Sequence, residues 1–414
     1  MSEAAVPPSG GGEWRRGYPV VIGGISGMVA QAVGFLSLGT LMTPLVETFG
    51  WSRTEIVVVA AFAAALSPFI APVIGWSLDR FGPRRIALIG IVLYPATLAL
   101  AGLTGPSISS WWAAWVVITL ANFFLSPIVW SFAVTKAFKE RRGFTIGLVL
   151  SGNGIANFAV PLFLVWALTE FGWRGAYFAL AAAVFVICGA VLWLLFRMPK
   201  GVQVTAADES TGETGMTAAQ AMRTSRYWRL ALVIFLGAAA VGALNVHLQP
   251  MLIDRGATIL AAAGLAAAFG PAQIVGRLLG GYLLDKIPGT LLGFVVFLLP
   301  AVSCGLILAG MGLGPLAIIV PTCIGFAAGV ELDIATYMAG RYFGRRHFGA
   351  IFSVLFVFFI VGYTVAPLGA AYIRDVTGDY RNVLLAICAM LPVTAILCGT
   401  LGRYPDGSAS EPHA

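Results

Sequence analysis

The sequence predicts an all-α polytopic membrane protein, with twelve transmembrane helices in two pseudo-symmetric six-helix bundles. Three observations support this fold class. Hydrophobic residues make up 59% of the 414 residues and charged residues only 10%, whereas about a quarter of an ordinary soluble domain is charged. The apolar residues gather in runs of about 20, the length that crosses a bilayer core as a helix. The two halves of the chain also repeat one another at a nearly constant offset.

Twelve apolar stretches follow one another along the chain, separated by more polar loops. Some contain proline, such as Pro68, Pro161 and Pro367, which a membrane bundle tolerates because neighbouring helices satisfy the freed backbone groups. We expect the transmembrane helices near residues 18–43, 54–78, 86–104, 110–135, 144–168, 174–196, 227–250, 259–284, 290–310, 314–338, 348–372 and 382–402.

Lysine and arginine are distributed unevenly between the two sides of these spans. Nineteen of the 25 fall on the side with both termini, five on the other, and Arg277 lies inside a span. Because positive loops stay in the cytoplasm, both termini are predicted to be cytoplasmic, in a plasma (inner) membrane. The predicted parts are an N-terminal tail (1–17), a six-helix bundle (18–196), a cytoplasmic linker (197–226), a second six-helix bundle (227–402) and a C-terminal tail (403–414).

The internal repeat is clearest in the cytoplasmic loops. GWSLDRFGPRR at 75–85 corresponds to GYLLDKIPG at 281–289, and KAFKERRGF at 136–144 corresponds to RYFGRRHFG at 341–349. The common spacing of these pairs indicates duplication of a six-span unit.

The loop GWSLDRFGPRR closely resembles the G-x-x-x-D-R-x-G-x-R-R signature of the major facilitator superfamily, with a weaker echo at GYLLDK. Together with twelve spans and a central linker, the resemblance covers nearly the whole chain. It implies the major facilitator fold and secondary active transport by alternating access. It also implies that charged residues of these loops hold the cytoplasmic side closed, which assigns gating to Asp79, Arg80, Arg84, Arg85 and Asp285.

Within that superfamily, the chain resembles the branch of monocarboxylate porters and oxalate/formate-type exchangers. The resemblance is carried by FGWSR at 49–53, by Gly276-Arg277 and by GVELDIATYMAGRYFG at 329–344. It implies that Arg277 meets the carboxylate of a small organic anion. Some relatives carry a second embedded lysine in the first or eleventh span, and this sequence has none, which favours a single carboxylate.

Arg277 is the strongest candidate for substrate binding. It precedes Asp285 by eight residues, so it lies about 12 Å from the helix end, near the middle of a core roughly 30 Å thick. An unpaired arginine there is costly and must face a cavity or a partner, and guanidinium matches a carboxylate in forked geometry. The alternative is a structural ion pair with Asp333 or Glu331.

Three titratable residues inside the spans are candidates for proton coupling. Glu331 and Asp333 point about 200° apart on a helix, so they cannot both face one cavity. Alternatively, they lock the end of their span to Arg341 and its basic neighbours. His247 titrates in the physiological range, although a lone histidine near an interface is often simply a hydrogen-bonded helix residue.

Polar side chains within other spans complete the predicted substrate cavity, although buried amides also join helices to one another. These candidates are Asn245, Gln31, Asn122, Asn153, Asn157 and Tyr363.

Other classes of function fit the sequence less well. It has no Walker loop, and its five cysteines lie in apolar stretches without metal-ligand spacing, so neither an ATP-driven pump nor a metal or other cofactor is expected. The expected partners are an organic anion, a proton or counter-ion, and the bilayer, for a monomer that binds no nucleic acid. Efflux of drug-like amphipathic compounds and a non-transporting sensor on the same fold are the alternatives. A membrane enzyme would need a nucleophile with a base, or a metal cluster, and the single histidine within the spans disfavours this class.

Overall fold

The computed structural model describes residues 10–138, 142–199, 215–314, 316–344, 348–402 and 404. Across these residues the chain is helical, and no strand forms apart from an isolated bridge between Gly215 and Gly344. The predicted all-α class is confirmed.

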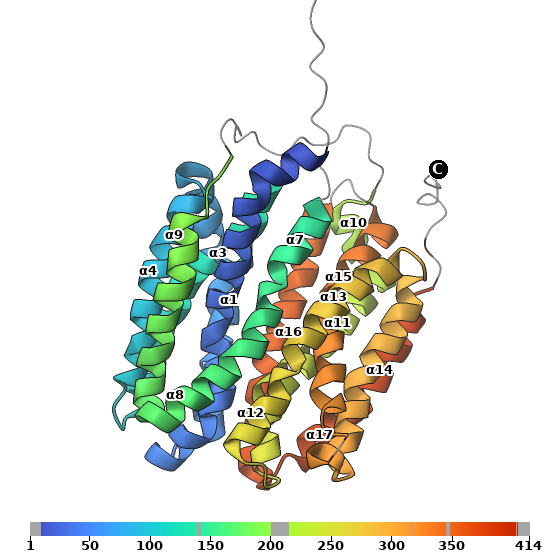
Figure 1. Cartoon of the computed structure of the whole chain (residues 1–414). Helices are drawn as coiled ribbons and strands as arrows, with labels where there is room; N and C mark the ends of the chain where they lie inside the picture. The colour runs from blue at the N-terminus through green and yellow to red at the C-terminus, as the bar shows by residue number, and fades with distance from the viewer. Residues whose placement is uncertain are drawn as a thin grey trace, which may run out of the picture. The chain divides into compact units, whose positions relative to one another are not determined.

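The elements fall into two successive groups along the chain (Figure 1). The first group comprises α1 (Gly10–Phe49), α2 (Arg53–Val57), α3 (Ala60–Phe81), α4 (Pro83–Gly102), α5 (Ile108–Asn122), η1 (Phe123–Leu125), α6 (Pro127–Ala137), α7 (Arg142–Leu150), α8 (Gly152–Ala183), η2 (Val184–Cys188) and α9 (Gly189–Leu194). The second comprises α10 (Ala218–Met222), α11 (Ser225–Ile253), α12 (Ile259–Ala267), α13 (Phe269–Leu284), α14 (Gly289–Leu308), η3 (Met311–Leu313), α15 (Ile319–Phe343), α16 (Phe348–Thr377) and α17 (Arg381–Gly399).

The apolar helices account for the twelve predicted spans. Among the described residues, ten helices are long and apolar enough to cross a membrane, and the pair Arg53–Ser67 and Phe69–Leu78, bent by 54°, passes the same test when its two helices are taken together. One of the ten, Phe144–Leu194, is 51 residues long and is broken at Gly172, whose φ of 67° is not helical. Because about 20 residues suffice to cross the bilayer, this stretch is long enough for two spans, which gives twelve when the bent pair is counted as one span.

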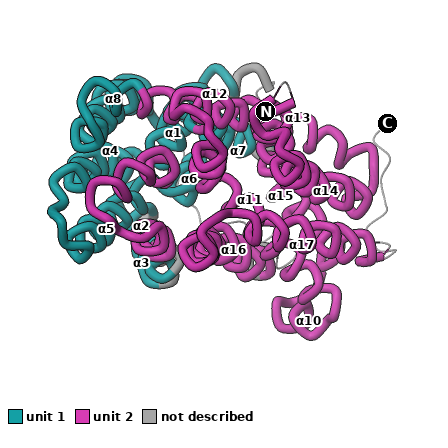
Figure 2. Tube along the Cα trace, turned by 90° about the horizontal axis from the view of Figure 1, so that it is seen from below, with its two compact units in different colours: residues 1–34, 65–156, 166–206 teal, residues 35–64, 157–165, 207–414 magenta. Residues whose placement is uncertain are grey.

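The chain forms two compact units (Figure 2). Unit 1 holds residues 1–34, 65–156 and 166–206, and unit 2 holds residues 35–64, 157–165 and 207–414. Unit 2 therefore includes the end of α1, all of α2 and a short piece of α8, although these segments precede the linker in the sequence.

Unit 1 packs large aromatic side chains against glycines. Trp130 is fully buried, its Nε1 donates to the carbonyl of Leu125 at 2.8 Å, and its ring fills the space beside Gly27 of α1. The hydroxyl of Tyr94 accepts a hydrogen bond from the backbone nitrogen of Gly34 at 3.0 Å. Glycine leaves room for these rings, which explains part of the high glycine content of the spans.

Unit 2 is built from closely packed helix pairs: α11 with α16, α13 with α15, and α14 with α17 (Figure 1). Glycines permit these contacts. A Cβ at Gly242 of α11 would lie 2.9 Å from the Cα of Tyr363, and one at Gly276 of α13 would lie 3.0 Å from the Cα of Phe326. Such close crossings hold polar side chains at fixed positions between the helices.

Candidate substrate and coupling site

Arg277 and Asp333 face one another between α13 and α15. The Nη1 of Arg277 lies 3.5 Å from Oδ1 of Asp333, and the two side chains are 10% and 27% exposed. The helices approach closely here because α15 has Gly329 at the crossing, where a Cβ would lie 2.7 Å from the backbone nitrogen of Arg277. Of the two ion pairs considered from the sequence, the structure forms the one with Asp333.

This ion pair is loose. Hydrogen-bonded pairs of arginine and carboxylate usually measure about 2.7–2.9 Å, and in the described part of the chain the guanidinium of Arg277 makes no hydrogen bond. Its charge is therefore balanced by Asp333, but its N–H donors are not saturated. A guanidinium in this state retains the capacity to bind an anion.

Glu331 lies two residues earlier on α15 and faces a different helix. Its side chain is 2% exposed, and its Oε1 has no hydrogen-bond partner among the described residues. A Cβ at Gly237 of α11 would lie 2.9 Å from this oxygen. The opposite directions predicted for Glu331 and Asp333 are thus observed. Neither carboxylate pairs with Arg341 among the described residues.

Amide side chains border a small pocket in unit 2. The Nδ2 of Asn245 donates to the hydroxyl of Tyr363 at 2.9 Å, and the Nδ2 of Asn157 donates to Oε1 of Gln273 at 3.3 Å. Gln273 lies one turn from Arg277 on α13, so polar groups continue from the pocket toward the guanidinium. The pocket is lined by Phe35, Leu36, Gly39, Asn157, Pro161, Asn245, Val246, Leu248, Gln249 and Ala266.

Gln273 was not predicted from the sequence. Its spacing of four residues before Arg277 places both on one helix face, and this pattern could have identified it.

The other amide candidates lie in unit 1. The Nδ2 of Asn122 on α5 donates to the backbone carbonyl of Gln31 on α1 at 2.9 Å. This bond joins two helices, which is the structural role that buried amides commonly have. Asn153 is half-buried on α8.

The predicted gating residues form no ion pair within the described part of the chain. Arg80 lies over the ring of Trp76, 5.3 Å from its centroid, and Arg84 donates to the carbonyl of Trp193 at 3.4 Å. Arg85 and Asp285 are exposed. The side chain of Asp79 lies outside the described residues. Gating by these residues stays a prediction.

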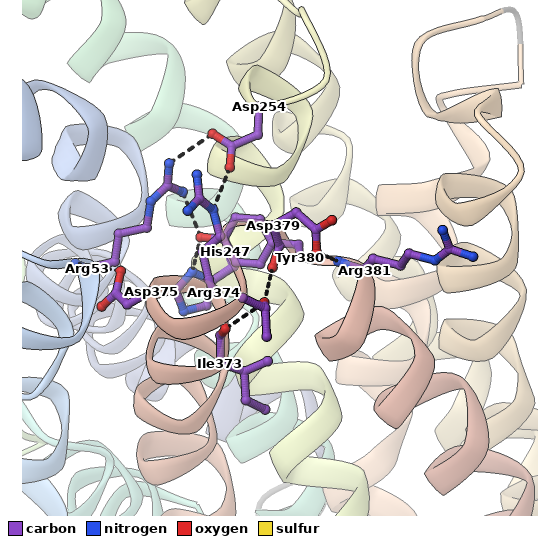
Figure 3. A network of polar contacts seen from close by, with 10 residues as sticks. Arg53, His247, Asp254, Ile373, Arg374, Asp375, Asp379, Tyr380 and Arg381 are labelled. Atoms are coloured by element: carbon purple, nitrogen blue, oxygen red, sulfur yellow. Dashed lines mark hydrogen bonds and ion pairs between the residues drawn. The ribbon is translucent and has the colours of Figure 1, made fainter.

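A second polar group, which we call the Arg53 cluster, consists of Arg53, His247, Asp254, Arg374, Asp375 and Tyr380 (Figure 3). Arg53 is buried at the first turn of α2. Its Nη2 lies 2.8 Å from Oδ1 of Asp254, and its Nη1 donates to the hydroxyl of Tyr380 at 2.8 Å. The Nε of Arg374 binds the other oxygen of Asp254 at 2.9 Å.

Asp375 holds the start of α2. Its carboxylate accepts hydrogen bonds from the backbone nitrogens of Arg53 and Thr54 at 3.2 and 2.8 Å, and from the Thr54 hydroxyl at 2.6 Å. Free backbone N–H groups at a helix start favour a carboxylate. In the sequence Arg53 stands out only as the last residue of FGWSR at 49–53, because nothing local indicates that a loop arginine is buried by distant residues.

His247, on α11, is the fully buried member of this cluster. Its Nδ1 lies 2.8 Å from the Tyr380 hydroxyl and its Nε2 lies 2.9 Å from the carbonyl oxygen of Pro367. Burial raises the pKa of Tyr380 to about 12, against the opposing effect of the Arg53 charge, so its hydroxyl keeps its proton at neutral pH. His247 thus belongs to a group of residues separate from Arg277.

Apolar spans with charged and amide side chains buried between them are typical of multi-pass membrane proteins that move a solute. The sequence model of the Major Facilitator Superfamily matches residues 24–367. The chain belongs to this superfamily, as the loop motif predicted.

Comparison with individual proteins agrees with this assignment. The chain is 27% identical to monocarboxylate transporter 13 of Bos taurus, over 94% of this chain and 89% of that protein. It is 28% identical to human monocarboxylate transporter 11, over 98% and 86%. The predicted resemblance to the monocarboxylate branch is confirmed. Among solved structures, a bacterial homologue of the human lysosomal transporter Spinster, inward-facing and occupied, superimposes with a TM-score of 0.72 at 15% identity, over 96% of this chain and 98% of that one.

Proposed function

We propose that this transporter carries small organic anions, foremost monocarboxylates, together with protons, by alternating access. The observation that carries the proposal is the guanidinium of Arg277, which is buried between α13 and α15 with its charge balanced by Asp333 but its donors unsaturated. A carboxylate is the ligand that such a group binds best. The printed names of the relatives, monocarboxylate transporters, support the same class of substrate.

Charge balance at the ion pair supports coupling to protons. Arg277 and Asp333 together are neutral. When a substrate carboxylate takes the place of Asp333 on the guanidinium, the site gains one negative charge within a medium of low dielectric constant. A proton on the displaced Asp333 restores neutrality at the lowest cost. One proton therefore accompanies each monovalent anion.

Glu331 has a different part in this scheme. Among the described residues no cation lies near enough to pair with it, and its Oε1 is unbonded. Because an uncompensated charge within the spans is costly, we assign it a proton throughout the cycle. Asp333 is then the carboxylate that alternates, and Asn245, Asn157 and Tyr363 provide neutral hydrogen bonds to the rest of the substrate.

The orientation of the protein in the membrane and the two halves that move are inferred from the sequence. Both termini and the linker lie in the cytoplasm of a plasma (inner) membrane, and the halves 18–196 and 227–402 rock against each other. Asp79, Arg80, Arg84, Arg85 and Asp285 close the cytoplasmic side.

Reconstituted protein tests the proposal. Vesicles with an acidic exterior should accumulate a radiolabelled monocarboxylate such as lactate or pyruvate, and dissipation of the pH gradient should abolish accumulation. Arg277→Lys keeps the charge but loses the forked geometry, so transport should fall at least about tenfold, which corresponds to ~1.4 kcal/mol. The matched control Arg381→Lys, on an exposed arginine, should transport normally. Unchanged transport by Arg277→Lys contradicts the proposed site.

A further inference from the structure

The Arg53 cluster joins segments that lie on opposite sides of the linker in the sequence. Arg53 and Thr54 come from the first half, whereas Asp254, Arg374, Asp375 and Tyr380 come from the second half, and all of them lie within unit 2. We propose that the Arg53 cluster is a latch that closes one end of the transport path, and that a proton on His247 releases it. This inference rests on transport by alternating access, since only then must such contacts break and re-form.

The contacts of the cluster hold α2 at two points. The Arg53 side chain is fixed by Asp254 and Tyr380, each at 2.8 Å, and the backbone of its first turn is fixed by Asp375. The Arg53 guanidinium also lies over the Tyr380 ring, 5.3 Å from its centroid. Arg53 is buried, so these charge-assisted bonds are little screened by water.

The charges of the cluster cancel only while His247 is neutral. Arg53 and Arg374 are cations, and Asp254 and Asp375 are anions, so they contribute two charges of each sign. A proton on His247 adds a positive charge that no further carboxylate of the cluster compensates. Tyr380, before α17, contacts the imidazole directly, and the charged groups of the cluster around it are Arg53 from α2, Asp254 after α11, and Arg374 and Asp375 from α16 (Figure 3).

The hydrogen bonds of the cluster also require a neutral His247. The carbonyl of Pro367 only accepts, so Nε2 of His247 carries the ring proton. Nδ1 is then an acceptor, and the Tyr380 hydroxyl donates to it while its oxygen accepts from Arg53. In this series of hydrogen bonds, which runs from Arg53 through Tyr380 to His247, each donor meets one acceptor.

Protonation of His247 breaks this chain of hydrogen bonds. Nδ1 becomes a donor, so the Tyr380 hydroxyl faces donors from both His247 and Arg53 and its own proton loses its acceptor. The new imidazolium also repels Arg53. Both effects weaken the hold on Arg53, and the latch is therefore closed at neutral pH and released at acidic pH.

Distance measurements between spin labels test the latch without any substrate. The labels are placed at Glu47→Cys, at the exposed end of α1, and at Leu260→Cys, at the exposed start of α12, in a protein whose five native cysteines are replaced by serine. Both positions lie outside the Arg53 cluster. Pulsed electron–electron double resonance in lipid nanodiscs is recorded from about pH 8, where an ordinary histidine is neutral, down to about pH 4.

We expect a short distance at high pH and a growing population of longer distances as the pH falls. Arg53→Gln should give longer distances at every pH, whereas His247→Gln should keep the short distance at every pH. Tyr380→Phe, which removes the hydroxyl between the two residues, should also abolish the pH response. Arg381→Gln is the control, because this side chain turns away from the cluster (Figure 3), and it should behave as the unaltered protein.

Two results would overturn the proposal: a short distance retained in Arg53→Gln, or an unchanged pH response in both His247→Gln and Tyr380→Phe. Failure of the transport proposal gives a different pattern. In that case the distances respond to pH and to the variants as described, while vesicles accumulate no carboxylate.

Discussion

Arg277 and Asp333 illustrate how a buried charge can be balanced without being fully bonded. The sequence indicated an arginine near the middle of a span and allowed two carboxylate partners, because helical geometry gives directions but not the identity of the facing helix. The structure brings Asp333 to 3.5 Å and turns Glu331 toward α11. This division gives the two carboxylates different expected behaviour, although they are two residues apart.

Asp333→Asn should separate anion binding from proton coupling. The variant leaves Arg277 without a counter-charge, so a substrate carboxylate becomes its best partner and binding should tighten. Accumulation driven by a pH gradient should be lost, because the amide cannot take up a proton. Binding is measured by thermal stabilisation with lactate, and coupling by uptake into vesicles. Gradient-driven accumulation at the normal level would exclude Asp333 as the proton carrier.

Glu331→Gln should have little effect, since it replaces a neutral acid by a neutral amide of the same shape. We expect an apparent melting temperature within a few degrees of the unaltered protein and retained pH-driven uptake. If this variant still moves substrate but no longer accumulates it under a pH gradient, then Glu331 carries the proton and the assignment to Asp333 is wrong.

At the level of the helices, apolar runs predicted all twelve spans because bilayer thickness imposes their length. The break at Gly172 falls in the loop predicted between the spans 144–168 and 174–196. The bend between Arg53–Ser67 and Phe69–Leu78, within the span predicted at 54–78, was not predicted. The burial of Arg53 was not predicted either, because Asp254 and Tyr380 are about 200 and 330 residues away in the sequence.

The crossing of α13 and α15 should be sensitive to side-chain size at one glycine. Gly329→Ala places a methyl group 2.7 Å from the backbone nitrogen of Arg277, so the helices must separate. We expect destabilisation of about 1–3 kcal/mol and reduced transport. The control Gly281→Ala lies on α13, where the added methyl group meets nothing within 4 Å. A melting temperature equal in both variants would show that the crossing tolerates the methyl group.

Across the protein as a whole, the loop motif GWSLDRFGPRR and the twelve spans were sufficient to predict the superfamily, which the match over residues 24–367 confirms. The polar contacts were less predictable. Unit 2 holds Arg277, Asn157, Asn245 and Tyr363. Hydropathy does not distinguish these polar residues from Asn122, whose amide joins α5 to α1. The hydrogen-bond partner of each amide depends on how its helix is rotated, and the packing of the helices sets that rotation.

The proposed orientation can be tested by labelling in intact cells. Val376→Cys lies near the end of α16 and Ala219→Cys lies on α10, and both positions are exposed. A membrane-impermeant thiol reagent added outside should label Val376→Cys directly, but should label Ala219→Cys only after the membrane is disrupted. The reverse pattern would place the termini outside the cell.

The most direct test of anion recognition is a thermal-shift measurement on purified protein with carboxylic acids and their neutral amides, such as lactate and lactamide. The acids should raise the melting temperature, the amides should not, and Arg277→Lys should lose the response to the acids. Equal stabilisation by acid and amide, or a full response in Arg277→Lys, would contradict the account of Arg277 as the carboxylate-binding group.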